Sequence, residues 1–250
     1  MLLLVALGAL VATNTVRSIR SRRVLQSVAL ARDTTLTTEQ RALGMLKREV
    51  GPADAQKTSP AELRRRVANL ASGTYVDDIL AEQDSALYRW PERLHDAVRV
   101  YIEPSSEVAG WDPGYPAMAQ AVFDEWGLAG FPLRFSFVYD SAQADMSIRW
   151  RDRFPDQDGQ RIGVTERIQS SDFFIARAGI TIALHDSSGR VLPPTIVAGI
   201  VRHEVGHALG LNHANDPSSV MYREAATMTL SASDRATLRL LYLVPGGSLK

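Results

Sequence analysis

Apolar and polar residues alternate or recur at regular spacings through the C-terminal part of this chain. Short, partly alternating runs rich in β-branched and aromatic residues predict strands. Runs with apolar residues at helical spacing, bounded by Pro, Ser or Gly, predict helices. The predicted strands are 97–104, 132–140, 144–150, 159–168 and 172–186, and the predicted helices are 115–127, one from about 194, and 231–245. This order of elements predicts an α+β or α/β domain over residues 96–250.

The chain begins with an apolar segment, residues 1–16, which is followed directly by several arginines. The run is shorter than the ~20 residues of a full membrane span, so it predicts a signal peptide or a membrane anchor. We therefore expect an exported protein, either secreted or anchored by this hydrophobic segment. The orientation stays open, because the arginines favour a cytoplasmic position for the residues after the segment.

Residues 17–95 predict a basic, helical N-terminal region. Helices are expected over 37–51, over 59–73 with Ser59 as the N-cap and Gly73 as the stop signal, and over 75–83. The pattern assigns no role to this region, and a propeptide, a spacer and a tether remain alternatives.

Composition narrows the classes of function. The 28 basic and 28 acidic residues balance to a formal net charge of zero, which argues against a nucleic-acid binder. The absence of cysteine excludes disulfides, thiolate metal sites and cysteine catalysis. The hydrophobic fraction of 45% is enough for a buried core. Nothing in the sequence indicates an oligomeric state.

Three of the five histidines fall in one short run, "IVRHEVGHALGLNHANDPSSVMYR", residues 200–223. His203 and His207 are four residues apart, so on a helix their imidazoles lie on one face and can share a cation. Glu204 is rotated by about 100° from His203, which places it beside that cation rather than on it. This is the H-E-x-x-H pattern of zinc peptidases.

A catalytic zinc site needs a third protein ligand, and His213 is the candidate. A continuous helix would carry His213 about 9 Å beyond His207, so the chain must turn back between them. Gly210 can end the helix there, because glycine accepts a positive φ at little cost. The sequence therefore predicts that His203, His207 and His213 bind one zinc ion.

The sequence "HEVGHALGLNH", followed by "SVMY", resembles the metzincin metallopeptidases and, within them, the matrixins. The segments "ADMSIRW" and "LSASDRATLRLLY" are also similar to matrixin elements, so the resemblance covers roughly Val98 to Pro245. It implies a twisted, mostly parallel five-stranded sheet with an active-site helix and a C-terminal helix. It also implies that Met221 is the methionine of the turn beneath the zinc.

The motif and the resemblance together predict a zinc-dependent metalloendopeptidase, in which Glu204 activates a zinc-bound water against a peptide bond. The alternative is a catalytically silent, zinc-stabilised binding domain of the same fold. The resemblance further implies that a protein or peptide substrate pairs with the edge strand of the sheet, which we place within 172–186.

This sequence departs from the matrixin pattern in several ways. Because the chain contains no cysteine, residues 17–95 could inhibit the enzyme only by a mechanism that does not use a propeptide thiolate. Arg223 occupies the position where a proline often follows the Met-Tyr pair. His185 and Asp186 lack partners for a second, structural zinc, so we expect one catalytic zinc. Asp152, Asp156 and Asp158 could offer carboxylates to calcium, but their spacing fits no EF-hand, and we expect a solvated loop.

Overall fold

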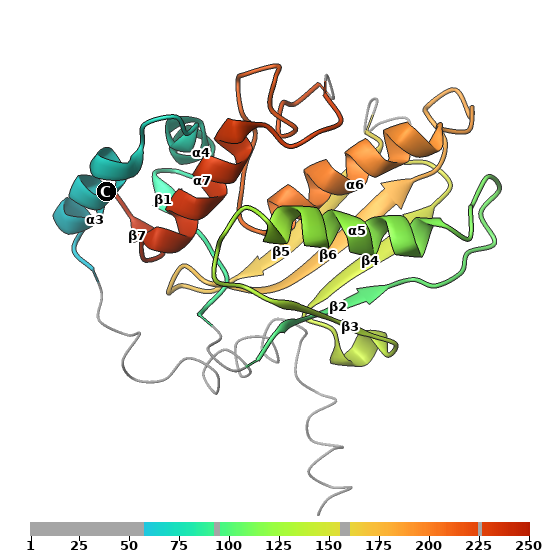
Figure 1. Ribbon diagram of the computed structural model, residues 1–250, viewed down its shortest axis with the longest axis horizontal. Helices are drawn as coiled ribbons and strands as arrows, with labels where there is room; N and C mark the ends of the chain where they lie inside the picture. The colour runs from blue at the N-terminus through green and yellow to red at the C-terminus, as the bar shows by residue number, and fades with distance from the viewer. Residues whose placement is uncertain (1–57, 93–95, 156–160, 225–226) are drawn as a thin grey trace, which may run out of the picture. The chain divides into compact units, whose positions relative to one another are not determined.

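A computed structural model describes residues 58–92, 96–155, 161–224 and 227–250 (Figure 1). The chain divides into two compact units, Met1–Met45 and Leu46–Lys250, and every described residue belongs to the second. The predicted signal or anchor segment 1–16 and the predicted helix 37–51 lie outside the described residues. Among the residues that are described, no helix is both long enough and apolar enough to cross a membrane.

A five-stranded sheet forms the centre of the described unit, in the order β3-β2-β4-β6-β5. The strands β2, β3, β4 and β6 run parallel, and β5 lies antiparallel to β6 at one edge. Their bounds are β2 Val98–Ile102, β3 Phe135–Val138, β4 Met146–Arg151, β5 Gly163–Gln169 and β6 Ile175–Ala183. The mostly parallel five-stranded sheet implied by the resemblance is confirmed.

The alternation seen in the sequence of β4 is the alternation of its burial. Met146, Ile148 and Trp150 are buried, whereas the residues between them are partly or fully exposed. Met146 and Ile148 also pair in register with residues of both neighbouring strands, β2 and β6. β4 is therefore an interior strand that contributes the centre of the core.

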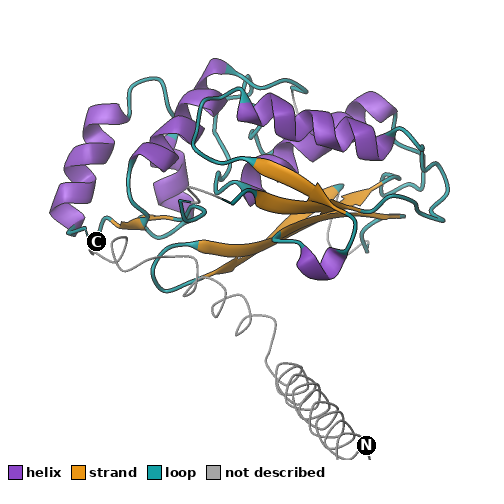
Figure 2. Ribbon diagram, turned by 60° about the horizontal axis from the view of Figure 1, so that its bottom comes forward, coloured by secondary structure: helices purple, strands orange, loops and turns teal. Residues whose placement is uncertain are grey.

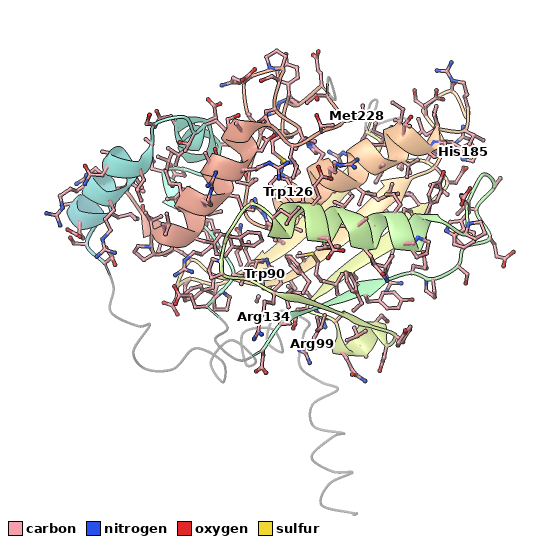
Figure 3. All side chains as sticks on the ribbon, viewed as in Figure 1. Trp90, Arg99, Trp126, Arg134, His185 and Met228 are labelled. Carbon is pink, nitrogen blue, oxygen red and sulfur yellow. The ribbon has the colours of Figure 1, made fainter. Side chains whose placement is uncertain are left out.

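Helices α5 (Tyr115–Gly127) and α6 (Pro194–Ala208) cover one face of the sheet and pack against each other (Figures 1 and 2). Gly206 of α6 allows the close approach, because a Cβ there would lie 3.1 Å from the indole of Trp126. Trp126 in turn donates a hydrogen bond from Nε1 to the carbonyl of Arg202 at 3.1 Å, and Figure 3 shows its side chain between the helices. This contact fixes the position of the helix that carries the histidine motif.

Helix α7 (Ala232–Leu243) is the last helix of the region that resembles the matrixins, and Ser231 is its N-cap. The Ser231 side chain accepts a hydrogen bond from the backbone N–H of Asp234, and the Asp234 carboxylate accepts one from the backbone N–H of Ser231. This capping box satisfies donors that a helix N-terminus leaves unpaired. The cap residue is the first residue of the predicted helix 231–245.

The described residues upstream of the sheet contribute to the same hydrophobic core. Helices α3 (Pro60–Leu70) and α4 (Val76–Glu82) form where the sequence predicted them, and Ser59 caps α3. Strand β1 (Ala86–Leu87) pairs antiparallel with β7 (Gly247–Ser248) near the C-terminus. Leu63, Ile79 and Trp90 are buried in one cluster with the residues of the sheet and of α6.

Candidate metal centre

Helix α6 brings the first two predicted ligands together. The Nε2 atoms of His203 and His207 lie 3.0 Å apart, and the ring centroids are 4.7 Å apart. Two nitrogens bound to a tetrahedral zinc at 2.0–2.1 Å would be about 3.3 Å apart, so the observed spacing fits zinc. The i, i+4 geometry predicted from the sequence is therefore present in the structure.

The chain bends after α6 and returns His213 to the other two imidazoles. Gly210 has φ +108, and a Cβ at this position would lie 2.5 Å from the backbone oxygen of Tyr88. Both the dihedral angle and the close approach demand glycine. The His213 ring centroid is 5.5 Å from that of His203 and 4.8 Å from that of His207. The structure thus brings all three predicted ligands together, with candidate ligand atoms within 4.8 Å of one another.

Each imidazole has a partner at Nδ1. The Nδ1 atom of His203 lies 2.7 Å from the carbonyl oxygen of Val220, and that of His207 lies 3.0 Å from the carbonyl oxygen of Leu211. The Nδ1 atom of His213 lies 3.2 Å from Oε1 of Glu82. Partners of this kind hold the proton on Nδ1 and leave Nε2 as the metal-binding nitrogen.

The electrostatics of the site favour neutral imidazoles, which is the form that binds a metal. Burial lowers the pKa of His203 and His213 and lowers the pKa of His207 well below its ordinary value. For His213 the charge of Glu82 acts in the opposite direction, although burial is the larger effect. The donor set, its spacing and its charge state all fit a zinc ion.

Glu204 is buried beside the histidines, on the side of α6 that faces β5. Its Oε2 atom lies 2.7 Å from the hydroxyl of Thr165 on β5. Burial raises the pKa of Glu204 to about 7, and the hydrogen bond from Thr165 opposes this rise. A carboxyl group with such a pKa can both accept and return a proton near neutral pH.

Met221, the predicted turn methionine, is fully buried against the same helix. A Cβ on Gly206 would lie 2.4 Å from its sulfur, so the thioether packs directly on the α6 backbone between the two helical histidines. The Met221 carbonyl accepts a hydrogen bond from the N–H of Ala214 at 2.9 Å, which ties the turn to the loop of His213. This location agrees with a supporting position beneath the ligands.

The histidines and Glu204 open onto a cleft of about 1150 Å³ whose wall is strand β5. Because β6 pairs with β4 on one side and with β5 on the other, it is an interior strand. The prediction that segment 172–186 holds the substrate-pairing edge was therefore wrong, and the edge strand beside the site is β5. The cleft is lined by Glu82, Arg161, Ile162, Gly163, Val164, Thr165, Arg167, Ile200, His203, Glu204, His207, Asn212, His213, Arg223 and Glu224.

Several of these contacts carry no local signal in the sequence. Thr165 is separated by 39 residues from Glu204, and Glu82 by 131 residues from His213. Arg167 donates to Oδ1 of Asn212 at 2.9 Å and to the carbonyl of His207 at 3.3 Å, which also holds the bend after α6. Only the pairing of strands and helices in three dimensions brings these residues to the site.

His185, which is labelled in Figure 3, follows the C-terminal end of β6 and lies next to Asp152. The Nδ1 atom of the buried His185 is 2.8 Å from Oδ1 of Asp152. From the sequence we expected His185 to lack partners for a structural zinc, and the structure places one carboxylate beside it. Asp156 and Asp158 lie outside the described residues.

The family model described as Matrixin, of the M10 peptidases, matches residues 112–243 of this chain. The chain belongs to the matrixin family. The matched part includes α5, four of the five sheet strands, α6 with its histidines, and α7. The resemblance inferred from "HEVGHALGLNH" and "SVMY" is thereby confirmed, together with the fold class that it implied.

A protein of Heliothis virescens ascovirus 3e named "Putative matrix metalloproteinase" is 26% identical to this matrixin over 113 residues. The matched region covers 40% of this chain and 23% of that protein, so the two share one region rather than their whole length. Membership of the matrixin family supports a metallopeptidase, zinc as its metal and proteins or peptides as its substrates.

Proposed function

We propose that this matrixin is a zinc-dependent metalloendopeptidase in which His203, His207 and His213 bind one zinc ion and Glu204 is the general acid and base. The observation that carries the proposal is the position of a buried carboxylate, Glu204, next to three converging imidazoles at the floor of an open cleft. A zinc ion held by these three histidines would supply a Lewis acid, able to make water more acidic and to polarise the scissile carbonyl.

Glu204 has the position needed for proton transfer. Its carboxylate lies among the groups that line the cleft, where it can accept a proton from the attacking water and pass it to the departing amine. Thr165 holds Oε2 of Glu204, which leaves Oε1 available to the water. A residue in this place that acted only structurally would not need to face the cleft.

Strand β5 supplies the binding surface for an extended peptide. Within the described part of the chain, its outer edge pairs with no other strand, and its residues Gly163, Thr165 and Arg167 line the cleft beside the histidines. A peptide that pairs with this edge gains main-chain hydrogen bonds, which provide affinity independently of the substrate sequence. The scissile bond would then cross the site next to Glu204.

The test compares the wild type with Glu204→Gln on a mixed peptide library, with zinc content measured for both proteins. We expect equal zinc and a loss of cleavage of about 10²–10⁴-fold, the usual contribution of a general acid or base. Glu224→Gln is the matched control, because Glu224 is an exposed carboxylate of the same cleft.

Two results would contradict the proposal. Cleavage by Glu204→Gln at the wild-type rate would remove the role of this residue. Zinc binding with no cleavage by the wild type itself would favour the silent, zinc-stabilised binding domain.

A further inference from the structure

Helix α4 lies against the loop that carries His213, although α4 precedes the family-matched region 112–243. Asp78 accepts hydrogen bonds from both the backbone N–H and the side-chain amide of Asn215, at 2.9 and 2.7 Å. Gln83, the residue that directly follows α4, donates to Oδ1 of Asn212 at 2.6 Å. The two ends of the loop 212–215 are thus held by side chains from one short segment.

Glu82 contacts the middle of this loop, at the candidate ligand itself. Its Oε2 atom accepts a hydrogen bond from the backbone N–H of His213 at 3.3 Å, and its two oxygens lie 3.2 and 3.3 Å from Nδ1. Backbone carbonyls occupy the equivalent position on His203 and His207. Among the described residues, Glu82 is therefore the one charged group at an Nδ1 atom of the three imidazoles.

We propose that Glu82 is a positioning residue of the zinc site, which orients His213 through its Nδ1 atom and its backbone N–H. This inference rests on the zinc site of the proposed function and extends that site to a residue outside the matrixin match. A carboxylate at Nδ1 holds the proton there, directs Nε2 toward the metal and increases the basicity of the ring.

His213 needs such a partner more than the other two ligands do. His203 and His207 are fixed by the helix backbone of α6, whereas His213 follows the bend at Gly210 and lies in a loop. A loop side chain keeps more conformational freedom before metal binding, and that freedom is lost on binding. The contacts from Glu82 remove part of it in advance.

Arg223 shares the carboxylate of Glu82 in an ion pair. The Arg223 side chain is largely exposed, so solvent screens this pair and we expect it by itself to contribute little. Arg223 contacts Oε1 of Glu82, and Nδ1 of His213 lies 3.2 Å from the same oxygen. Replacement of Arg223 therefore separates the ion pair from the contact with the histidine.

The remaining contacts show that the upstream segment is built into the site. Trp90 donates from Nε1 to the carbonyl of Ala208, at the end of α6, at 2.8 Å. The backbone oxygen of Tyr88 occupies the space that a side chain at position 210 would need. Residues 76–90 therefore brace both the bend and the loop that present His213. For this part of the N-terminal region, the contacts favour a permanent scaffold over a removable propeptide.

The experiment measures the zinc dissociation constant of the full chain by competition with a chromophoric chelator. The variants are Glu82→Ala, Glu82→Gln and Arg223→Gln. His213→Ala serves as the positive control. Glu62→Gln is the negative control, because it removes a carboxylate of α3 that pairs with Arg65 and Arg66. Thermal unfolding of each metal-free variant reports separately whether the fold is retained.

We expect Glu82→Ala to weaken zinc binding about 10–100-fold, the usual effect of losing such an outer partner. Glu82→Gln should lose less, because its amide oxygen can still accept from Nδ1–H. Arg223→Gln and Glu62→Gln should stay within about threefold of the wild type. The metal-free unfolding temperature of Glu82→Gln should match that of the wild type, which distinguishes positioning of His213 from general stability.

Wild-type zinc affinity in both Glu82 variants, with a large loss in His213→Ala, would overturn the role of Glu82 and leave the zinc site intact. An equal loss in Arg223→Gln and Glu82→Ala would also overturn it, since the ion pair would then account for the effect. Unchanged affinity in His213→Ala would instead contradict the proposed zinc site itself. If Glu82→Ala does not fold, Glu82→Gln decides by the same criteria.

Discussion

The hydroxyl of Thr165, on the edge strand β5, lies 2.7 Å from Oε2 of Glu204 and 2.9 Å from the backbone oxygen of the same residue. This hydroxyl therefore connects the strand that forms the wall of the cleft to the proposed general base. A hydrogen bond to a charged group contributes about 1.5–3 kcal/mol, which is enough to fix the orientation of a carboxylate. Thr165 is, on this geometry, a positioning residue for Glu204.

Thr165→Val should lower kcat by about 10-fold or more, because Glu204 loses the partner that holds its carboxylate. Zinc content should not change, since the hydroxyl of Thr165 bonds to Glu204 rather than to a histidine ring. Thr165→Ser keeps the hydroxyl and should keep most of the activity. Steady-state kinetics of both variants would test this, and equal rates for valine and serine would show that the hydroxyl is not needed.

Gly163 lets β5 pass beside the same carboxylate. A Cβ at this position would lie 2.5 Å from Oε1 of Glu204 and 2.7 Å from Cγ2 of Ile200. Gly163→Ala should therefore displace Glu204, lower activity strongly and cost about 1–3 kcal/mol of unfolding free energy. Gly179→Ala on β6 is the matched control, because its Cβ would meet only Ser147, at 3.9 Å. If both variants behaved alike, crowding at Glu204 would not be the cause.

The proposed ligands and the proposed base could be picked out from the sequence because their geometry is local. His203, Glu204 and His207 occupy fixed angles on one helix, and Gly210 indicates the bend that returns His213. The helix and strand positions were likewise predicted from periodicity, as in β4, where the alternating residues Met146, Ile148 and Trp150 are the buried ones.

The edge of the sheet and the outer partners of the site could not be predicted in this way. The sequence predicts both β5 and β6 as strands, and only their pairing shows that β5 is the edge strand. Glu82 and Thr165 are ordinary helix and strand residues in the sequence, and the fold alone places them at His213 and Glu204. Contacts between distant residues leave no periodic signal in one sequence.

Asp234 links the cap of α7 to the segment before Met221. This fully buried carboxylate accepts hydrogen bonds from the backbone N–H of Val220 at 3.0 Å and of Ser231 at 2.7 Å, and from the hydroxyl of Ser219. Asp234→Ala would leave buried donors without an acceptor, at about 1–3 kcal/mol for each group. We expect a fall of at least about 3 kcal/mol in the free energy of unfolding, measured by urea denaturation.

Zinc affinity should also fall in Asp234→Ala, because the carbonyl of Val220 is the Nδ1 partner of His203. Ser233→Ala is the control, since the Ser233 hydroxyl contacts that of Ser231 at the rim of the same cap. An Asp234→Ala protein as stable as the Ser233→Ala protein would show that the buried carboxylate does not hold the turn.

Metal removal should lower the stability of the folded chain, because the three imidazoles converge only in the native state. A ligand that binds the native state alone stabilises it by about 2.7 kcal/mol at 100 times its dissociation constant. For a folded unit of this size, each kcal/mol shifts the unfolding temperature by about 2–4 °C. Zinc added to chelator-treated protein should thus raise the unfolding temperature by about 5–10 °C.

His213→Ala should lose most of that rise in unfolding temperature. Magnesium should produce no rise in either protein, because imidazole ligands favour zinc. A rise of the same size in His213→Ala would mean that the stabilising zinc binds elsewhere.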